Sequence, residues 1–290
     1  MLLEPSIANS RNFSIPNPNG CLQCEDMTVI AQLHNAIDYP LRQLFRWGRG
    51  GLRWRNESKA EAYAQNPAAT LESERLLQTY DLGYFAGHSR TRNYRENLYY
   101  LALLERALSS LPTPTAGWAR AADIGASDWF YVHALFAFLK RHQTAPTLIG
   151  YEADAYRVYN DLHSRQDYAQ AYMRGLPAES VVYEPRAFVA QPAAFDLVTL
   201  FFPFVFERDH LAWGLPRGLF RPQSLLASAW ASLRPGGALM IVNQGADEHA
   251  AQQSAFSTLG IPIHHAARFE SPLFFYQIPR YLISAQKPVD

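Results

Sequence analysis

Residues 119–137 read A-R-A-A-D-I-G-A-S-D-W-F-Y-V-H-A-L-F-A, and this stretch decides the fold. A short apolar run of small residues ends at Asp123-Ile124-Gly125, and a helical pattern starts a few residues later. The pattern predicts a first strand, a tight glycine turn and the helix that follows it. In doubly wound α/β folds, such a turn brings backbone N–H groups and the positive end of a helix to a bound ligand.

After this turn, apolar runs keep alternating with helical patterns, which predicts an α/β fold with a doubly wound, mostly parallel sheet. The run at 195–203 is apolar almost throughout, which is typical of a central parallel strand. The other strands are predicted at 119–124, 147–152, 180–184, 238–243, 264–269 and 276–286. We expect Asp128 to cap the helix after the glycine turn, and Asp154 to cap a long helix that ends near Arg174.

The composition sets broad limits. The chain has 290 residues, of which 48% are hydrophobic and 18% charged, so we expect a large core and little disorder. Lys plus Arg and Asp plus Glu number 26 each, so no net charge draws the protein to nucleic acid or acidic membranes. Long apolar runs and a secretory signal pattern are both missing, which predicts a soluble, cytoplasmic protein.

Three segments are expected along the chain. Residues 1–26 are rich in Pro, Asn and Ser and predict an extended N-terminal arm. Residues 27–117 predict a helical cap that selects the substrate, and residues 118–290 form the α/β domain. In the cap we expect Thr28 to begin a helix that Pro40 ends or bends, followed by helices at 71–80 and 93–108.

Two stretches of the N-terminal part combine aromatic and basic residues. In residues 41–59, five arginines between positions 42 and 55 alternate with Trp47 and Trp54, a mixture that can hold phosphates and stack on bases. The alternative to such a binding site is a solvated turn in which the arginine stems pack on the tryptophan rings. Because the overall charge is neutral, a nucleic-acid partner is open but not favoured. Residues 80–88 suit either a lid loop or a helix–helix connection.

Cys21 and Cys24 are the only cysteines. A Cys-x-x-Cys pair can be a redox motif or half of a zinc site, but no second pair exists to complete a Cys₄ set. We therefore expect two thiols in the N-terminal arm and no metal site.

Four motifs occur in order: Asp123-Ile124-Gly125, Glu152 at the end of the second strand, Phe195-Asp196-Leu197-Val198, and Leu233-Arg234-Pro235-Gly236-Gly237 before the fifth strand. Together they resemble the class I S-adenosylmethionine-dependent methyltransferases, a Rossmann-like superfamily, over about residues 119–287. The resemblance implies a seven-stranded sheet of order 3-2-1-4-5-7-6 with the last strand antiparallel, and an N-terminal helical cap. It also implies S-adenosyl-L-methionine as the cofactor and a transferase activity.

The resemblance places five residues in the cofactor-binding turn: Asp123, Gly125, Ala126, Ser127 and Trp129. At Gly125 the backbone would pass close to the amino-acid part of the cofactor, where a side chain would collide. The N–H groups near 126–129 would receive the cofactor carboxylate.

The same resemblance assigns Glu152 and Glu184 to the cofactor, and Phe202 is added as part of an aromatic wall that suits its positive charge. Glu152 would accept hydrogen bonds from the two ribose hydroxyls, since a charged acceptor makes the stronger bonds. Glu184 would reach the adenine amino group, and Phe202 would face the sulfonium charge.

The chain departs from the family pattern in two places. The glycine loop is degenerate, because Ser127 and Trp129 replace two later glycines, and Trp129 either blocks the methionine end or lies beside it. Phe202-Pro203-Phe204 replaces the Asn/Asp-Pro-Pro-Tyr/Phe of many enzymes that methylate exocyclic amines of bases. The aromatic wall that remains favours a small or medium-sized acceptor, aromatic or apolar.

Methyl transfer from a sulfonium needs alignment and exclusion of water, and needs a base only where the acceptor loses a proton. His210 is the candidate base, and Asn243, with Gln244 beside it, would orient the acceptor. Two alternatives stay open: a catalytically silent member that serves as a binding or scaffold protein, and a nicotinamide-dependent oxidoreductase. The second lacks the Gly-x-Gly-x-x-Gly fingerprint of that class.

Overall fold

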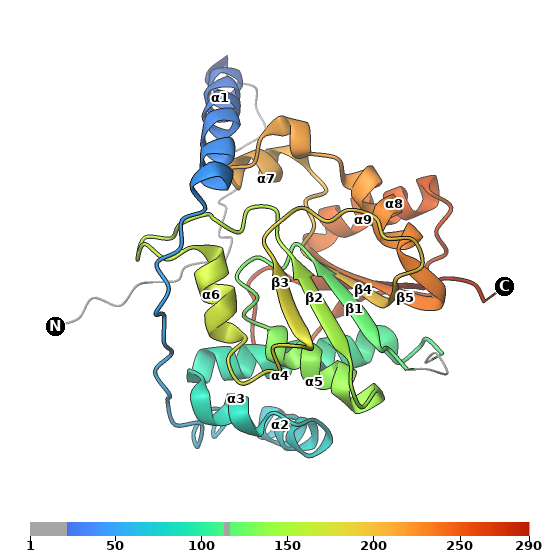
Figure 1. Cartoon of the computed structure of the whole chain (residues 1–290). Helices are drawn as coiled ribbons and strands as arrows, with labels where there is room; N and C mark the ends of the chain where they lie inside the picture. Colours follow the sequence, from blue (N-terminus) through green and yellow to red (C-terminus); the bar gives the residue numbers. More distant parts are fainter. Residues whose placement is uncertain (1–21, 113–116, 290) are drawn as a thin grey trace.

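In the computed structural model, seven strands form one sheet, and the described residues are 22–112 and 117–289, with side chains from residue 30 onward except 31 (Figure 1). The strand order is β3-β2-β1-β4-β5-β7-β6. β7 runs antiparallel to both of its neighbours, and the other pairs are parallel. The strands are β1 (Arg120–Ile124), β2 (Thr147–Tyr151), β3 (Val181–Glu184), β4 (Phe195–Phe201), β5 (Leu233–Gln244), β6 (His265–Phe269) and β7 (Arg280–Gln286). Both the predicted fold class and the predicted strand order are confirmed.

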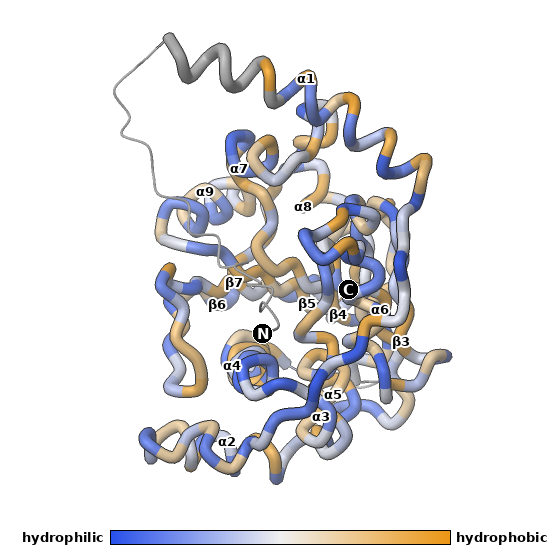
Figure 2. Tube along the Cα trace, turned by 90° about the vertical axis from the view of Figure 1, so that its left-hand side faces the viewer, coloured by the Kyte–Doolittle hydropathy of each residue, from blue (hydrophilic) through white to orange (hydrophobic). Residues whose placement is uncertain are grey.

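Helices cover both faces of the sheet. α4 and α5 pack on one face and α8 and α9 on the other, and the strands between them show hydrophobic colour in Figure 2. Every residue of β4 is buried, as a central parallel strand requires. The helices are α1 (Leu22–Phe45), α2 (Pro67–Thr79), α3 (Gly83–His88), α4 (Thr91–Leu108), α5 (Val132–His142), α6 (Arg165–Tyr172), α7 (Glu207–Ala212), η1 (Arg217–Leu219), α8 (Pro222–Ala231) and α9 (Gly245–Thr258).

β5 begins five residues before the predicted strand and includes the Pro-Gly-Gly turn. The pairing with β4 shifts register between Phe195 and Leu197, which marks a bulge. Gly237 is required there, because a Cβ would lie 2.9 Å from the carbonyl oxygen of Arg234. The motif therefore bends a continuous strand and does not precede it.

Two expected helix starts are wrong. α1 begins at Leu22, before Thr28, and it continues through Pro40 to Phe45. α5 begins at Val132 with Tyr131 as its N-cap, so Asp128 caps no helix and lies in the preceding turn.

Asp154 does not start a helix either. Its side chain is fully buried, and it accepts hydrogen bonds from Nε and Nη2 of Arg42 at 2.9 and 3.2 Å. The helix of this region is the short α6, and Ser164 and Asp167 form a capping box at its start. A bidentate partner far away in the sequence therefore takes the carboxylate that we expected to cap a helix.

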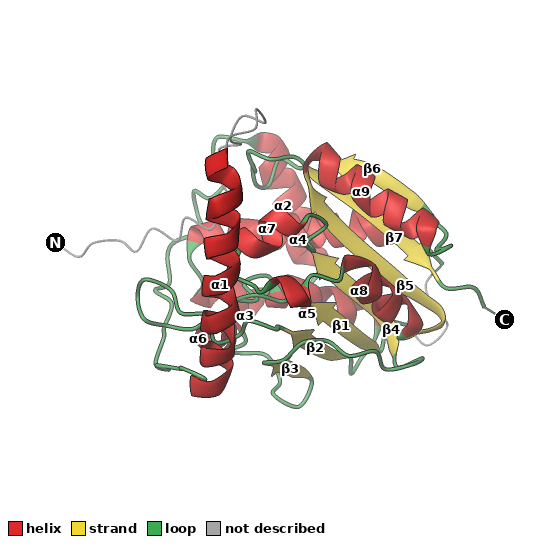
Figure 3. Cartoon of the chain, turned by 90° about the horizontal axis from the view of Figure 1, so that it is seen from above, coloured by secondary structure: helices red, strands yellow, loops and turns green. Residues whose placement is uncertain are grey.

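α1 stands at one side of the sheet, away from the core (Figures 1 and 3). Its inner face donates hydrogen bonds from Tyr39 and Gln43 to the carbonyl oxygen of Ala153, at 3.1 and 2.9 Å. Its outer face leaves Ile30, Leu33 and Ile37 more than 60% exposed. α1 therefore covers the segment that follows β2.

α4 belongs to the main core. Leu98, Leu101 and Leu104 are fully buried in the same cluster as Leu135 of α5. Residues 80–88 include the short helix α3, which lies between α2 and α4 (Figure 1). The division of the chain into an arm, a cap and an α/β domain stays a prediction. No helix in the described part of the chain is long and apolar enough to cross a membrane.

Candidate functional site

A cavity of about 1100 Å³ opens at the carboxyl ends of the parallel strands. Its walls come from the ends of β1, β2, β4 and β5, from α4 and α8, and from the chain that leads into β7. In doubly wound sheets this edge is where ligands bind.

The cavity divides the predicted site residues into two groups. Those that line it are Gly125, Ser127, Glu152, Phe202 and His210. Those that do not line it are Asp123, Ala126, Trp129, Glu184 and Asn243.

Gly125 forms the tight turn after β1. Its φ is +79°, a conformation that favours glycine, and a Cβ there would meet no atom within 4 Å. The space is open because it belongs to the cavity. The backbone at this position is therefore open to a ligand, and the role in cofactor binding that the resemblance implies stays a prediction.

The N–H groups of the turn already have partners. Those of Gly125 and Ala126 donate to the carbonyl oxygen of Tyr151 at 2.8 and 3.0 Å, and that of Trp129 donates to Ala126. The N–H of Ser127 donates to Oε2 of Glu152 at 2.8 Å. The turn therefore does not present the free N–H groups that we expected to receive a carboxylate.

Glu152 joins the turn to the end of β2. Besides the Ser127 bond, its Oε1 accepts from the backbone N–H of Asp154 at 2.8 Å and from Nη1 of Arg165 at 3.3 Å. A carboxylate has about four acceptor positions, so capacity remains for a hydroxyl from the cavity. Glu152 is both a structural link and the acidic group at the cavity wall.

Asp123 stabilises the turn from the core side. It accepts hydrogen bonds from Thr199 Oγ1 at 2.7 Å and from Tyr131 OH and Trp129 Nε1 at 2.8 Å each. Burial raises the pKa of Asp123 to about 6, although these donors favour the charged form. Asp123 thus acts on the turn from within the core.

Glu184 and Asn243 lie outside the cavity. Glu184 is about a third exposed and pairs with Arg186 at 3.0 Å. Asn243 is fully buried in β5, and neither atom of its amide has a partner in the described part of the chain. The next residue, Gln244, lines the cavity in its place, because successive side chains of a strand point to opposite faces.

The aromatic wall after β4 is present. Phe202 adopts a φ of 57°, which turns the chain at the end of the strand. His210 is buried, and its Nε2 lies 3.0 Å from the carbonyl oxygen of Pro216. A carbonyl only accepts, so Nε2 carries the proton and Nδ1 is left as an acceptor. Burial lowers the pKa of His210, which keeps the ring neutral.

Sequence reasoning missed a group of polar residues on the opposite wall. Glu96, on the buried side of α4, accepts from Nε of Arg92 at 3.3 Å, and burial raises its pKa to about 7. Tyr276 comes from the chain that leads into β7, and Arg280 is the first residue of that strand. Two features of the sequence could have indicated these residues. Glu96 is a charged residue on the apolar face of a helix, and Arg280 is a charged residue at the start of an apolar strand.

The arginine-rich stretch at 42–55 packs against the region of α6. Arg42 binds Asp154, and Trp47 Nε1 donates a hydrogen bond to the carbonyl oxygen of Leu162 at 2.8 Å. Trp54 stacks on Tyr172, with 4.5 Å between the centres of the two rings. Trp54 also lines the cavity. The stretch therefore forms a strap beside the cavity.

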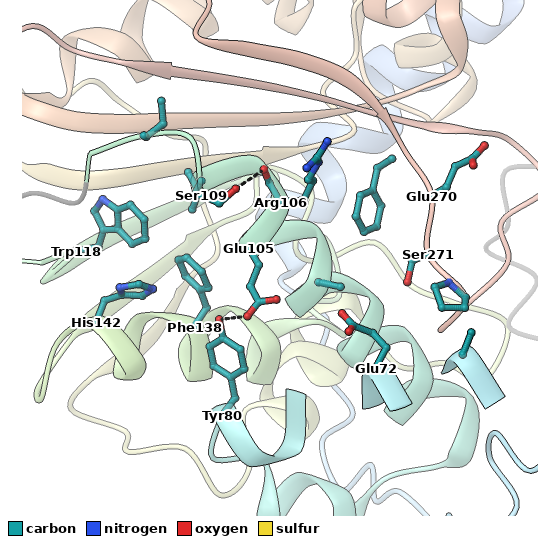
Figure 4. Close-up of a pocket in the computed structure, with 16 residues that line it drawn as sticks. Glu72, Tyr80, Glu105, Arg106, Ser109, Trp118, Phe138, His142, Glu270 and Ser271 are labelled. Atoms are coloured by element: carbon teal, nitrogen blue, oxygen red, sulfur yellow. Dashed lines mark hydrogen bonds between the residues drawn. The ribbon is translucent and has the colours of Figure 1, made fainter. Parts of the chain in front are cut away.

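A second hollow of about 760 Å³ lies between α2, α4 and the start of β1 (Figure 4). Tyr80, Trp118 and Phe138 line it, and Tyr80 donates a hydrogen bond to Glu105 at 2.9 Å. None of the predicted site residues lines this hollow.

No group of three or more potential metal ligands occurs in the described part of the chain. Cys21 lies outside the described residues, and so does the side chain of Cys24. The role of this cysteine pair stays a prediction.

No protein-family model and no curated protein matches the chain. Among solved structures, a methyltransferase dependent on S-adenosylmethionine from Aquifex aeolicus is similar at 11% identity and a TM-score of 0.43, over 79% of this chain and 98% of that one. Such an O-methyltransferase from Thermotoga maritima has 16% identity and a TM-score of 0.41, over 66% and 65%. A possible exported protein of Bordetella parapertussis has 13% identity and a TM-score of 0.44, over 93% and 99%. The pairing of the strands, and not these likenesses, establishes the fold.

Proposed function

We propose that this chain is an S-adenosylmethionine-dependent methyltransferase that acts on a small or medium-sized acceptor, aromatic or apolar. One observation carries the proposal: the open glycine turn at Gly125 and the carboxylate of Glu152 face the same cavity at the carboxyl edge of the sheet. The strand order that the resemblance implied supports it.

The residues at this edge fit the cofactor. The backbone at Gly125 leaves room for its amino-acid part, and Glu152 keeps acceptor capacity for the ribose hydroxyls. When bound, the cofactor supplies an electrophilic methyl group on a sulfonium. Phe202 lines the same cavity, with the Arg280 guanidinium 4.5 Å from the centre of its ring, and the hydrogen bonds from α1 to the carbonyl oxygen of Ala153 fix the segment beside Glu152.

Two side chains of the cavity can accept a proton from the acceptor. His210 has a free Nδ1, and Glu96 has a carboxyl group with a pKa of about 7. A base is most effective when its pKa lies near the working pH. On this criterion Glu96 is better suited to the role than His210, whose pKa is lowered by burial.

The silent scaffold was suggested by Trp129, which replaces a glycine in the turn. The Trp129 indole is fully buried outside the cavity. This position leaves the methionine end free and favours the enzyme over the scaffold. No observation in the cavity favours the oxidoreductase.

Calorimetric titration tests the proposal. We expect the wild-type protein to bind S-adenosylmethionine and S-adenosylhomocysteine, and NADH not at all. Ala153→Leu places three extra carbons beside Glu152 and should weaken both ligands, whereas Ala231→Leu at the exposed end of α8 should not. Binding of NADH alone, or no effect of Ala153→Leu, would contradict the proposal.

A further inference from the structure

Arg280, the first residue of β7, holds a positive charge inside the cavity. The residue is only 8% exposed, yet its guanidinium forms no ion pair with any carboxylate of the described residues. Nη1 donates to Oε1 of Gln244 at 2.8 Å, and the buried Nε has no partner. A buried charge is costly unless it is paired, so this arrangement points to an anion that is missing from the chain itself.

Two aromatic rings lie against the guanidinium. Its central carbon lies 4.5 Å from the centre of the Phe202 ring and 4.3 Å from that of Tyr276. The hydrogen bond from Nη1 to Gln244 fixes the guanidinium further. A fork fixed in this way matches the two oxygens of a carboxylate and has little side-chain entropy left to lose on binding.

One carboxyl group lies near Arg280: Glu96 acts on the same Tyr100 and Tyr276 side chains, but burial raises the pKa of Glu96 to about 7, so at neutral pH it does not fully balance the charge. The charge of Arg280 lowers the pKa of Tyr99, Tyr100 and Tyr276, in each case against a larger rise caused by burial. These phenols therefore stay neutral and donate or accept without cancelling the charge. The backbone N–H groups of the glycine turn, which would otherwise bind an anion, have partners within the chain. Of the five arginines that line the cavity, Arg55, Arg92 and Arg221 are exposed and Arg90 is half-buried, so Arg280 is the buried positive charge best placed to bind an anion.

We propose that Arg280 and Gln244 form a carboxylate-binding subsite of the methyl-transfer cavity. The carboxylate comes either from the methyl acceptor or from the methionine part of the cofactor, and the chemistry of the fork is the same for both. The inference rests on the proposed function. The strand order favours the acceptor, since β5 and β7 lie on the side of β1 opposite to β2 and Glu152.

The test compares ligands with and without a carboxylate. S-adenosylhomocysteine carries one, and 5′-methylthioadenosine lacks the amino-acid group altogether. Benzoate, 4-hydroxybenzoate and indole-3-acetate are each compared with their amides on the protein saturated with S-adenosylhomocysteine. The full chain is used as wild type and as Arg280→Met, which keeps a stem between the rings. The control is Arg268→Met on β6, which replaces an arginine that is 55% exposed and pairs with Glu270.

Two results support the subsite and identify the source of the carboxylate. If Arg280→Met weakens S-adenosylhomocysteine ten- to a hundredfold and leaves 5′-methylthioadenosine unchanged, the carboxylate is that of the cofactor. If S-adenosylhomocysteine is unaffected, and wild type prefers at least one acid over its amide by about tenfold, the carboxylate is that of the acceptor. That preference should disappear in Arg280→Met and persist in Arg268→Met.

Other results overturn the inference. The subsite is excluded if Arg280→Met binds S-adenosylhomocysteine as wild type does and wild type prefers no acid over its amide. The proposed function would survive this result. A wild-type protein that binds neither adenosine ligand refutes the proposed function itself. If Arg280→Met does not fold, Gln244→Ala frees the guanidinium without removing it, and the same preference should fall several-fold.

Discussion

Nε1 of Trp129 donates a 2.8 Å hydrogen bond to Oδ2 of Asp123, beneath the glycine turn. The indole occupies a slot that exists only because residue 150 is a glycine. A Cβ at Gly150 would lie 2.6 Å from Cζ2 of the indole. Trp129, which stands where the resemblance implies a glycine, is therefore buried in the core, and the cavity beside the turn stays open.

We predict that Trp129→Gly does not tighten the binding of S-adenosylmethionine. The side chain is outside the cavity, so its removal frees no space for a ligand. The loss of a fully buried aromatic side chain should cost about 3–5 kcal/mol of unfolding free energy. Urea unfolding and calorimetric titration measure the two effects. Tighter binding in the variant would support the silent scaffold.

Gly150→Ala should expel the indole from its slot. The new methyl group would lie less than 3 Å from three indole carbons, and backbone movement in a central part of the sheet is costly. We expect a lower melting temperature and a red-shifted tryptophan emission. Binding of S-adenosylhomocysteine should also weaken, because the displaced ring moves the turn above it. A variant with wild-type emission and stability would show that the slot is not needed.

The two glutamates that the resemblance assigned to the cofactor should behave differently. Glu152→Gln removes a charged acceptor at the cavity wall, so the affinity for S-adenosylhomocysteine should fall about ten- to a hundredfold. Glu184→Gln, outside the cavity, should change the affinity less than twofold, by titration under identical conditions. Because Glu152 also holds Ser127 and Arg165, the melting temperature of each variant must be measured alongside. An equal loss of affinity in both variants would indicate that Glu184 also binds the cofactor.

Glu96 predicts a pH dependence of stability. Burial raises its pKa from about 4.5 to about 7, so the folded protein binds a proton that the unfolded chain releases in this interval. Stability from this group is fully present below pH 4.5 and is lost as the pH rises to 7, by about 3 kcal/mol. Glu96→Gln should therefore gain stability relative to wild type between pH 4.5 and pH 8.

Urea unfolding at pH 4.5 and pH 8 measures this gain, with Glu74→Gln on the exposed side of α2 as the matched control. A difference between Glu96→Gln and wild type that is the same at both pH values would disprove the shift. In an active enzyme with a protic acceptor, the same variant should lose the rise of kcat with pH near 7.

The sheet could be predicted because the central strands are local apolar runs bounded by turn residues, and motif spacing then places Gly125, Glu152 and Phe202 at one edge. Glu96 and Arg280 could not be found in this way. They reach the cavity from a helix and from an antiparallel strand, and only tertiary packing brings these elements to the edge. The failed helix start at Asp154 has the same cause, because its partner Arg42 lies 112 residues away.

Two truncations should separate the roles of the N-terminal helices. A chain that starts at residue 118 lacks α4, whose fully buried leucines share a core with α5, so we expect it not to fold. A chain that starts at Gly48 keeps α4 and lacks α1, the residues before it and the hydrogen bond from Trp47 to Leu162, whereas the hydrogen bonds of Arg49 and Gly50 to Asp167 remain. This shorter chain should fold, as measured by circular dichroism.

The chain that starts at Gly48 should also bind S-adenosylhomocysteine more weakly. Without α1, the carbonyl oxygen of Ala153 loses both of its side-chain donors, and Asp154 loses its bidentate partner Arg42. The segment next to Glu152 is then free to move, and a mobile wall costs binding energy that a fixed wall does not. The point variant Arg42→Met, which keeps the helix, should show part of the same loss. If the shortened chain binds as well as the full chain, α1 has no part in the site.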